Sequence, residues 1–206
     1  NVAIYAAEKA TALGAKVVAM SDSGGFIHDP DGIDLALVKQ LKEVERKRIS
    51  EYVKTRTLAT FDPRCHAIWH IPCDIALPCA TQNEIDGESA AALVANGCRA
   101  VGEGANMPST PEAEDCFIAN KLVYGPGKAA NAGGVATSGL EMSQNSVRLS
   151  WTFEEVDARL NVIMVNIYHQ CAEAAEEFGD PGNLLLGANV AGFLKVGTAM
   201  YEQGCV

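Results

Sequence analysis

The sequence predicts an α/β protein built on a doubly wound parallel sheet, with helices covering both faces. Three observations support this prediction. Four short apolar runs lack polar alternation, as is typical of strands that are buried on both faces. Segments with helical periodicity separate these runs along the chain. Small or polar residues follow each run, as expected where an open α/β sheet binds its ligand beyond the carboxyl ends of its strands.

The first elements follow from turn residues and apolar spacing. Gly14 ends an apolar face with helical spacing, and Pro30 and Gly32 are typical turn residues. We expect, in order, a helix at residues 2–13, a buried strand at 16–20, a hairpin or wide turn at 26–32 and a charged helix at 34–55.

The later elements repeat the pattern and then become helical. Asp86 is a good N-cap, and Pro111 suits a first helical turn because the missing N–H would have no partner there. We expect strands at 73–77, 99–102 and 122–124, and helices at 86–95, from about 109, at 153–178 and at 184–203.

Composition narrows the class of protein. The 206 residues carry a net charge of −10, which argues against nucleic acid because phosphate binding needs clustered lysines and arginines. Charged or polar residues interrupt every apolar run, so no membrane span is expected. Seven cysteines without a CxxC pair favour a reducing cytosol over a disulfide framework, and no basic leader marks export.

A stretch rich in small residues, 128–146, is the most unusual part of the chain. Gly133 and Gly134 lie where a helix is expected to begin, and Leu140 and Met142 follow at roughly helical spacing. Glycine allows another surface to approach the backbone closely, and helix N-termini attract anions. Tight packing between helices is an equally good explanation of this stretch taken alone.

The beginning of the chain is compatible with dinucleotide binding. Asn1-Val-Ala3 before a helix could be the end of a G-x-G-x-x-G/A fingerprint, with an acidic turn at Asp22 some twenty residues later. Asp22 favours NAD, whereas Ser23 and the basic residues 46–48 suit the 2′-phosphate of NADP. The basic residues could also be a solvated helix face.

Two other motifs do not carry a site. Cysteines and histidines between residues 65 and 73 lack a paired CxxC, so we expect structural roles and no metal. Lys128 follows Gly-Pro-Gly, but Ala129 stands where a P-loop needs a hydroxyl for magnesium.

Asparagines follow three of the expected strands, at Asn83, Asn106 and Asn131. An amide both donates and accepts hydrogen bonds, which suits a carboxamide ring or ribose hydroxyls. Turn capping would explain any one of them. Three at one edge of a sheet favour a ligand.

Three motifs carry a family resemblance. Residues 74–83 (DIALPCATQN), 103–110 (EGANMPST) and 125–145 (GPGKAANAGGVATSGLEMSQN) resemble the coenzyme-domain motifs of the hexameric glutamate dehydrogenases of the Glu/Leu/Phe/Val dehydrogenase family. The similarity extends over the whole chain. It implies a Rossmann-like domain and reversible oxidative deamination of L-glutamate to 2-oxoglutarate and ammonia. It also implies a nicotinamide cofactor and a cytoplasmic homo-hexamer.

The resemblance also implies site residues, matched position by position. Asn1 would lie at the pyrophosphate, and Ser21, Asp22 and Ser23 at the adenosine ribose or its phosphate. Ala80, Thr81 and Asn106 would line the nicotinamide half. Ser138 would hydrogen-bond the substrate side-chain carboxylate with Val135 in the same pocket, and residues 139–148 would belong to a hinge-side helix. We prefer NADP to NAD, provided that the Asp22 side chain turns away from the phosphate.

The chain departs from the family in what it lacks. The family's catalytic lysine and aspartate belong to an N-terminal domain, and the glycines of the fingerprint to a first strand, and neither is present in this sequence. We therefore expect no catalytic residue here, an incomplete dinucleotide-binding domain at 1–148, and a helical segment at 149–206 that packs toward the missing substrate domain. Two alternatives remain: a leucine-, phenylalanine- or valine-type dehydrogenase, which Ser138 disfavours, and a cofactor-binding module without catalysis.

Overall fold

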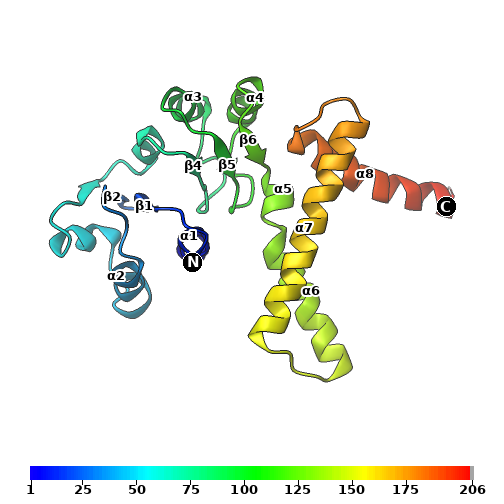
Figure 1. Cartoon of the computed structure of the whole chain (residues 1–206), viewed down its shortest axis with the longest axis horizontal. Coiled ribbons are helices and arrows are strands. Elements are labelled where there is room, and N and C mark those ends of the chain that lie inside the picture. The colour runs from blue at the N-terminus through cyan, green and yellow to red at the C-terminus, as the bar shows by residue number, and fades with distance from the viewer. Residues whose placement is uncertain (205–206) are drawn as a thin grey trace. The chain divides into compact units, whose positions relative to one another are not determined.

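The computed structural model describes residues 1–204 and contains two compact units, unit 1 at residues 1–122 and unit 2 from residue 123 onward. Figure 1 labels their helices and strands. The domain boundary expected at residue 148 concerns the organisation of a longer protein and stays a prediction.

An antiparallel sheet forms the first part of unit 1. Its elements are α1 (Val2–Ala12), β1 (Ala19–Asp22), β2 (Gly25–His28), α2 (Leu35–Lys39), η1 (Gln40–Val44), η2 (Ile49–Lys54) and β3 (Thr60–Asp62). The strands pair in the order β1-β2-β3. The hairpin turn lies at residues 23–24, and residues 26–28 of the expected turn belong to β2. A turn does form at its end, at Pro30 and Asp31, where the N–H of Gly32 donates to the carbonyl of Asp29 at 3.0 Å. Gly25 has φ 142°, and a side chain there would overlap the carbonyl oxygen of Asp62.

The prediction of a single helix at 34–55 is wrong, because the helix is interrupted near its middle. Helical structure ends after η1, Arg46 adopts φ 53°, and the 3₁₀-helical η2 begins at Ile49. A left-handed residue cannot continue a right-handed helix. Residues 45–48 therefore form a loop and not part of a helix surface. We call these residues the basic loop.

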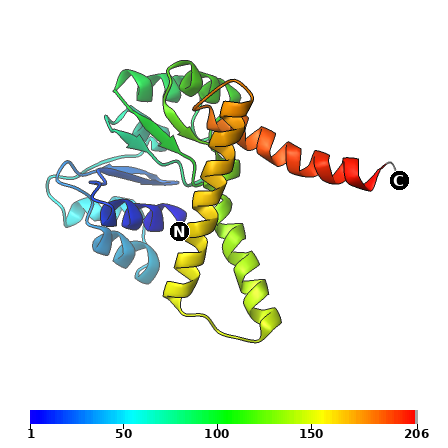
Figure 2. The same ribbon diagram turned by 45° about the vertical axis from the view of Figure 1, so that its right-hand side comes forward.

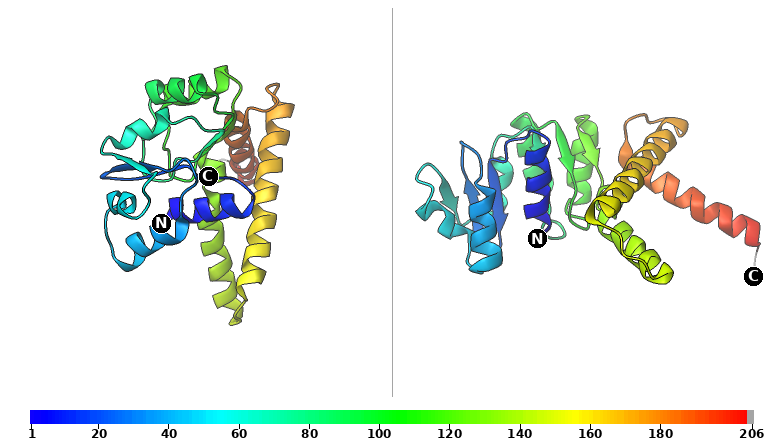
Figure 3. Two further views of the ribbon diagram at one scale, coloured as in Figure 1. Left: turned by 60° about the vertical axis from the view of Figure 1, so that its left-hand side comes forward. Right: turned by 60° about the horizontal axis from the view of Figure 1, so that its bottom comes forward.

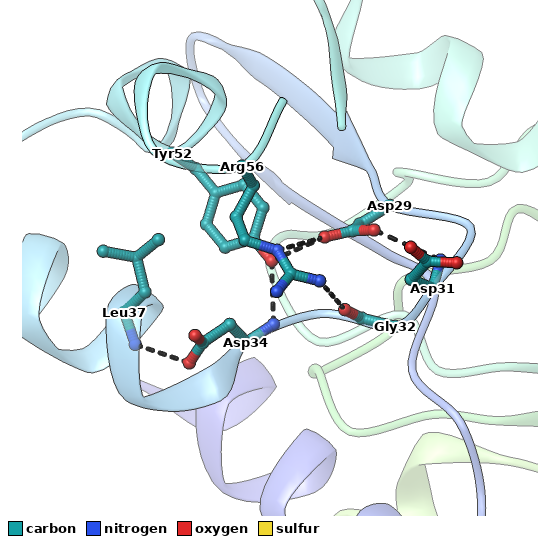
Figure 4. Close-up of polar contacts among 7 residues, drawn as sticks. All are labelled: Asp29, Asp31, Gly32, Asp34, Leu37, Tyr52 and Arg56. Carbon is teal, nitrogen blue, oxygen red and sulfur yellow. Dashed lines mark hydrogen bonds and ion pairs between the residues drawn. The ribbon is translucent and has the colours of Figure 1, made fainter. Parts of the chain in front are cut away.

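A buried carboxylate holds this half of unit 1 together (Figure 4). Asp29 is fully buried, and its Oδ2 accepts hydrogen bonds from the Tyr52 hydroxyl and from Arg56 Nε, both at 3.0 Å. The Tyr52 hydroxyl in turn accepts a bond from the backbone N–H of Asp34 at 2.8 Å. Apolar side chains surround the network: Ile4, Ala7, Met20, Ile27, Val38, Leu41, Ile49 and Ala59.

The second part of unit 1 contains the predicted parallel strands. Its elements are η3 (Cys65–His70), β4 (Ile75–Ala76), α3 (Gly87–Ala95), β5 (Ala100–Gly102) and α4 (Pro111–Ala119). β4 and β5 run parallel, with Ile75 opposite Ala100. Asp86 accepts the N–H of Ser89 at 2.8 Å, so the predicted N-cap is confirmed, as is Pro111 in the first turn of α4. Two views of this α/β arrangement are given in Figure 3, and the predicted fold class is confirmed.

Unit 2 is mainly helical. It contains β6 (Val123–Gly125), α5 (Gly127–Ala130), α6 (Ala132–Val147), α7 (Phe153–Glu177) and α8 (Leu184–Gln203). The two long helices begin and end within one residue of their predicted bounds. A capping box between Thr152 and Glu155 explains where α7 begins.

Glycines set how closely the helices of unit 2 approach each other (Figure 2). The backbone of α8 at Gly187 lies so near α7 that a side chain would collide with the carbonyl of Cys171. A Cβ added at Gly133 on α6 would make only ordinary van der Waals contact with Met164 and Leu160 of α7, and one added at Gly134 would meet open space. Close packing within the described residues therefore requires glycine at neither of these two positions.

The helix α8 corrects one expectation from composition. Its 20 residues have a mean hydropathy of 1.3 over an 18-residue window, enough in length and composition to cross a membrane. Asn189, Lys195 and Thr198 do interrupt its apolar residues, as expected, but they do not bring the helix below the hydropathy of a membrane span. Only 6% of the window is buried within the described residues, so this apolar surface is largely uncovered. One helix of this kind is weak support for a membrane location, because core helices of soluble proteins have the same composition.

Candidate cofactor and substrate sites

Asp22, at the end of β1, has its carboxylate fully engaged by the protein. Oδ2 lies 2.7 Å from Lys42 Nζ and accepts the N–H of Ile49 at 3.1 Å, while Oδ1 accepts the N–H of Gly24 at 2.8 Å. Burial acts to raise the pKa of Asp22, but these hydrogen bonds outweigh it and keep the pKa below its ordinary value. Asp22 is thus an ionised side chain directed toward η1 and η2.

Ser23, the next residue, has the positive charge of Arg48 beside it. Arg48 Nη1 donates a hydrogen bond to Ser23 Oγ at 2.6 Å, and both residues are exposed. Lys47, which precedes Arg48 in the basic loop, pairs instead with Glu45 at 2.7 Å. An arginine beside a hydroxyl, with the adjacent carboxylate neutralised, is a suitable site for a phosphate.

The loops that follow β4 and β5 lie side by side. Gly104 and Ala105 donate backbone hydrogen bonds to the carbonyl of Pro78, at 2.9 and 3.0 Å. Further along, Asn83 N–H donates to the carbonyl of Met107 at 3.0 Å, and both residues have φ 54°. These bonds bring the exposed residues Ala80, Thr81 and Asn106 to the same edge of the parallel pair.

Glu84 shapes the first of these loops. One side-chain oxygen accepts the N–H of Ala80 at 2.9 Å, and the N–H of Thr81 also bonds to the carboxylate. Its backbone carbonyl accepts the indole N–H of Trp69 at 2.9 Å. Burial raises the pKa of Glu84 despite the two N–H groups, and the neighbouring Glu103 acts in the same direction.

The N-terminus of α1 lies beside the same loops. Asn1 is the N-cap residue of α1, is exposed, and makes no side-chain cap hydrogen bond. The side chain of Val2 is a close neighbour of Gly104. Helix α1 thus directs its free N–H groups toward the edge that carries Thr81 and Asn106, where an anion would be stabilised.

The two proposed substrate residues lie in unit 2, on α6. Ser138 is exposed, and its hydroxyl donates to the carbonyl of Gly134 in the preceding turn at 3.3 Å. Val135 lies nearly one turn earlier and is 74% exposed. A hydroxyl bonded only within its own helix, at a long distance, exchanges readily for a better acceptor.

Sequence reasoning did not identify two of the residues that shape these sites. Lys42 lies twenty residues after Asp22, and only the fold shows that the two side chains meet. Glu84 follows Asn83, at the first of the three asparagine-bearing strand ends, and its sequence context suggests a solvated loop residue, although it is only 9% exposed. The sequence does offer one signal for Glu84: it is an acidic residue close to small residues, whose backbone N–H groups need an acceptor.

The arrangement joins a helix N-terminus, two strand-end loops and a basic turn within unit 1. Such an edge binds the pyrophosphate and sugars of a nucleotide in α/β sheets. The fold and the arrangement of these loops are therefore typical of the class of nucleotide-binding α/β domains.

Comparison with known proteins identifies the family. The family model described as "Glutamate/Leucine/Phenylalanine/Valine dehydrogenase" matches residues 1–204. The chain therefore belongs to this family, and the resemblance noted in the sequence is confirmed.

Individual relatives are similar over the entire chain. The NADP-specific glutamate dehydrogenase of Helicobacter pylori is 53% identical over 210 residues, which cover 99% of this chain and 47% of that protein. The glutamate dehydrogenase of Bacteroides thetaiotaomicron is 54% identical and covers 100% of this chain and 47% of its own length. The structure of Plasmodium falciparum glutamate dehydrogenase superposes with a TM-score of 0.92 at 46% identity, covering 98% of this chain and 44% of that one. The chain thus spans about half the length of the relatives it matches.

Proposed function

We propose that the chain is the coenzyme-binding half of a glutamate dehydrogenase that prefers NADP. The intact enzyme would interconvert L-glutamate with 2-oxoglutarate and ammonia. Support comes from relatives about half identical to this chain that carry the name NADP-specific glutamate dehydrogenase. We further propose that it acts in the cytoplasm as a homo-hexamer, on the basis of the family alone.

One observation carries the cofactor preference: Asp22 is neutralised by Lys42 while Arg48 lies at Ser23. A free carboxylate at this turn would accept both ribose hydroxyls and repel a 2′-phosphate. Here the carboxylate is already paired, and the arginine and hydroxyl would receive the phosphate. Ser21, on the same strand, would complete the contact with the ribose.

The rest of the cofactor would lie along the loops of unit 1. Asn1 and the N-terminus of α1 would hold the pyrophosphate, and Ala80, Thr81 and Asn106 would contact the nicotinamide half. When bound, the nicotinamide supplies hydride transfer to and from the substrate α-carbon. The protein's task in this half is to position that ring and to hold it in a fixed orientation.

The substrate side chain would be recognised from unit 2. We propose that Ser138 exchanges its long bond to Gly134 for the substrate carboxylate, with Val135 beside it. Residues 139–148 would belong to the segment that moves when the cleft closes, and Arg148, with φ 56°, ends α6 there. The proton-transfer groups would come from the other half of the enzyme.

The uncovered apolar surface of α8 supports the proposal that this chain is one half of a longer enzyme. We propose that residues 149–206 pack against the substrate-binding half of the full-length protein. A leucine-type dehydrogenase is disfavoured, because an apolar substrate would leave the Ser138 hydroxyl without an acceptor.

Two measurements on the full-length enzyme test the proposal. The kcat/KM should be higher with NADP than with NAD, and a clear preference for NAD would refute the cofactor assignment. Ser138→Ala should weaken 2-oxoglutarate binding by about 1–3 kcal/mol, the cost of removing a bond to a charged group. An unchanged constant for 2-oxoglutarate would remove Ser138 from the site.

The third measurement uses this chain alone. It should show no glutamate-dependent reduction of NADP, because the proton-transfer groups would be absent. Turnover by the isolated chain would show that catalytic groups lie within these residues.

A further inference from the structure

Two cysteines lie opposite each other at the start of the parallel strands. Cys73 precedes the first residue of β4 by two positions, and Cys98 precedes the first residue of β5 by two positions. Ile75 pairs with Ala100, so continuing the register by two residues places Cys73 opposite Cys98. The carbonyl of Asp74 accepts the N–H groups of Arg99 and Ala100 at 2.8 and 3.2 Å, so the strands are still hydrogen-bonded there.

The geometry of adjacent strands suits a disulfide. Neighbouring strands lie about 5 Å apart, within the range of Cα separations that a disulfide spans. The two thiols are close enough for each to shift the pKa of the other, and Cys98 Sγ lies 3.7 Å from the carbonyl oxygen of Asp74, the residue after Cys73. Both cysteines are present as free thiols, Cys98 buried and Cys73 partly exposed.

The two thiols differ in reactivity. The interaction with Cys73 lowers the pKa of Cys98, although burial opposes the shift, and the same interaction raises the pKa of Cys73. By contrast, burial raises the pKa of Cys79 to about 11. Of the two paired thiols, Cys98 is therefore the one that loses its proton more readily.

We propose that Cys73 and Cys98 form a reversible redox site that peroxides oxidise to a disulfide. The Cys98 thiolate attacks one peroxide oxygen, the O–O bond breaks, and the other oxygen leaves as hydroxide or alkoxide. The resulting Cys98 sulfenic acid is attacked by the Cys73 sulfur, which forms the S–S bond and releases water. Two electrons pass from the thiols to the peroxide, and a reducing thiol reverses the reaction.

The site lies away from the proposed cofactor contacts. The cysteines precede β4 and β5, whereas Ala80, Thr81 and Asn106 follow the same strands. The disulfide would join the beginnings of the two strands that carry the cofactor loops at their other ends. The proposal does not depend on which cofactor or substrate the enzyme uses.

Peptide mapping of the full-length protein tests the proposal. The protein is treated with hydrogen peroxide, its remaining thiols are alkylated, and the digest is analysed by mass spectrometry. We expect a peptide pair linked through Cys73 and Cys98 that lacks two hydrogens and that dithiothreitol separates. Recovery of both cysteines in alkylated form, or of a Cys98 sulfinic acid without the link, would overturn the proposal.

Variants and a second probe make the result specific. Cys65→Ser should retain the linked peptide, because Cys65 lies on η3 outside the pair, and Cys98→Ser should abolish it. Phenylarsine oxide, which binds two neighbouring thiols, should protect Cys73 and Cys98 from alkylation in the reduced protein. If phenylarsine oxide does not change the rate at which the two thiols of the reduced protein are alkylated, the proposed contact between the two sulfurs is contradicted.

Discussion

Arg48 and Ser23 meet across the β1–β2 turn, with the guanidinium donating to the serine hydroxyl at 2.6 Å. The contact exists because the helix that the sequence predicts through residues 34–55 is interrupted at Arg46. On a continuous helix, Arg48 would be one of three basic residues on a solvated face. In the basic loop it is directed at the turn, whereas Lys47 is held by Glu45.

Arg48→Ala should reduce the affinity for NADP far more than that for NAD. Removing a charged hydrogen bond costs about 1.5–3 kcal/mol, so we expect the KM for NADP to rise by roughly 10–100-fold. Steady-state kinetics of the full-length enzyme with both cofactors give this ratio. Lys47→Ala is the matched control and should change neither constant. An equal loss with both cofactors would mean that Arg48 does not contact the phosphate.

Asp29 should make stability depend on pH under acidic conditions. Burial acts to raise the pKa of Asp29, but the bonds from Arg56 and Tyr52 outweigh it, so the folded pKa lies below the unfolded value of about 3.9. A lowered folded pKa stabilises the fold above the unfolded pKa, and this stabilisation is lost as pH falls through the folded pKa. Urea unfolding between pH 6 and 2 measures it (roughly the span of carboxylate titration).

The variant Asp29→Asn separates this contribution from other carboxylates. It should be less stable than the parent at neutral pH, since the Arg56 charge loses its partner, and its stability should decline less on acidification. Tyr52→Phe is the companion variant, which removes the hydroxyl bonded to both Asp29 and Asp34. If Asp29→Asn and the parent lose stability in parallel as pH falls, Asp29 is not responsible.

Glu84→Ala should impair cofactor binding through the shape of the loop. The substitution leaves the N–H groups of Ala80 and Thr81 without their acceptor, so the loop no longer has one preferred conformation. We expect a several-fold higher KM for the cofactor, on the order of 1 kcal/mol, with a smaller change in kcat. Glu84→Gln, which keeps a side-chain oxygen, should restore most of the affinity. Failure of Glu84→Gln to do better than Glu84→Ala would argue for a role of the charge instead.

Gly187→Ala should destabilise unit 2, because the added methyl group meets the backbone of Cys171 and not a movable side chain. Overpacking of this kind costs about 1–3 kcal/mol. Gly192→Ala on the same helix is the control, since nothing lies near its position, and alanine favours a helix over glycine. Thermal unfolding should therefore show opposite shifts for the two variants. Similar midpoints would indicate that α7 and α8 do not cross at Gly187 in solution.

The sequence was sufficient for β4, β5 and most helices, whereas the strand expected at 16–20 in the parallel sheet is β1 of the antiparallel sheet. Helical periodicity, Asp86, Pro111 and the Thr152 capping box are local signals, and local signals determine where helices begin. The helix break at Arg46 was not predictable, because arginine has no preference for φ > 0 that would announce it. It is stabilised by a distant contact, the Ile49 N–H donating to Asp22.

The candidate site was predictable in its loops and not in its charges. Asn106 and Thr81 follow strands, so the parallel register brings their loops together without further information. The pairing of Lys42 with Asp22 decides whether the acidic turn repels a phosphate, and it depends on the position of η1 above β1. The contact between Cys73 and Cys98 likewise follows from the strand register, which the sequence does not reveal.

The basic loop has an implication for how cofactor choice could evolve in this scaffold. Its residues and the Ser23–Gly24 turn contribute no side chain to the hydrophobic core, which begins again only at Ile49. Under the proposed assignment of the NADP phosphate to Ser23 and Arg48, exchanging these residues would alter cofactor preference without removing a side chain from the core. Preference for one dinucleotide over the other is then separable from the stability of the domain.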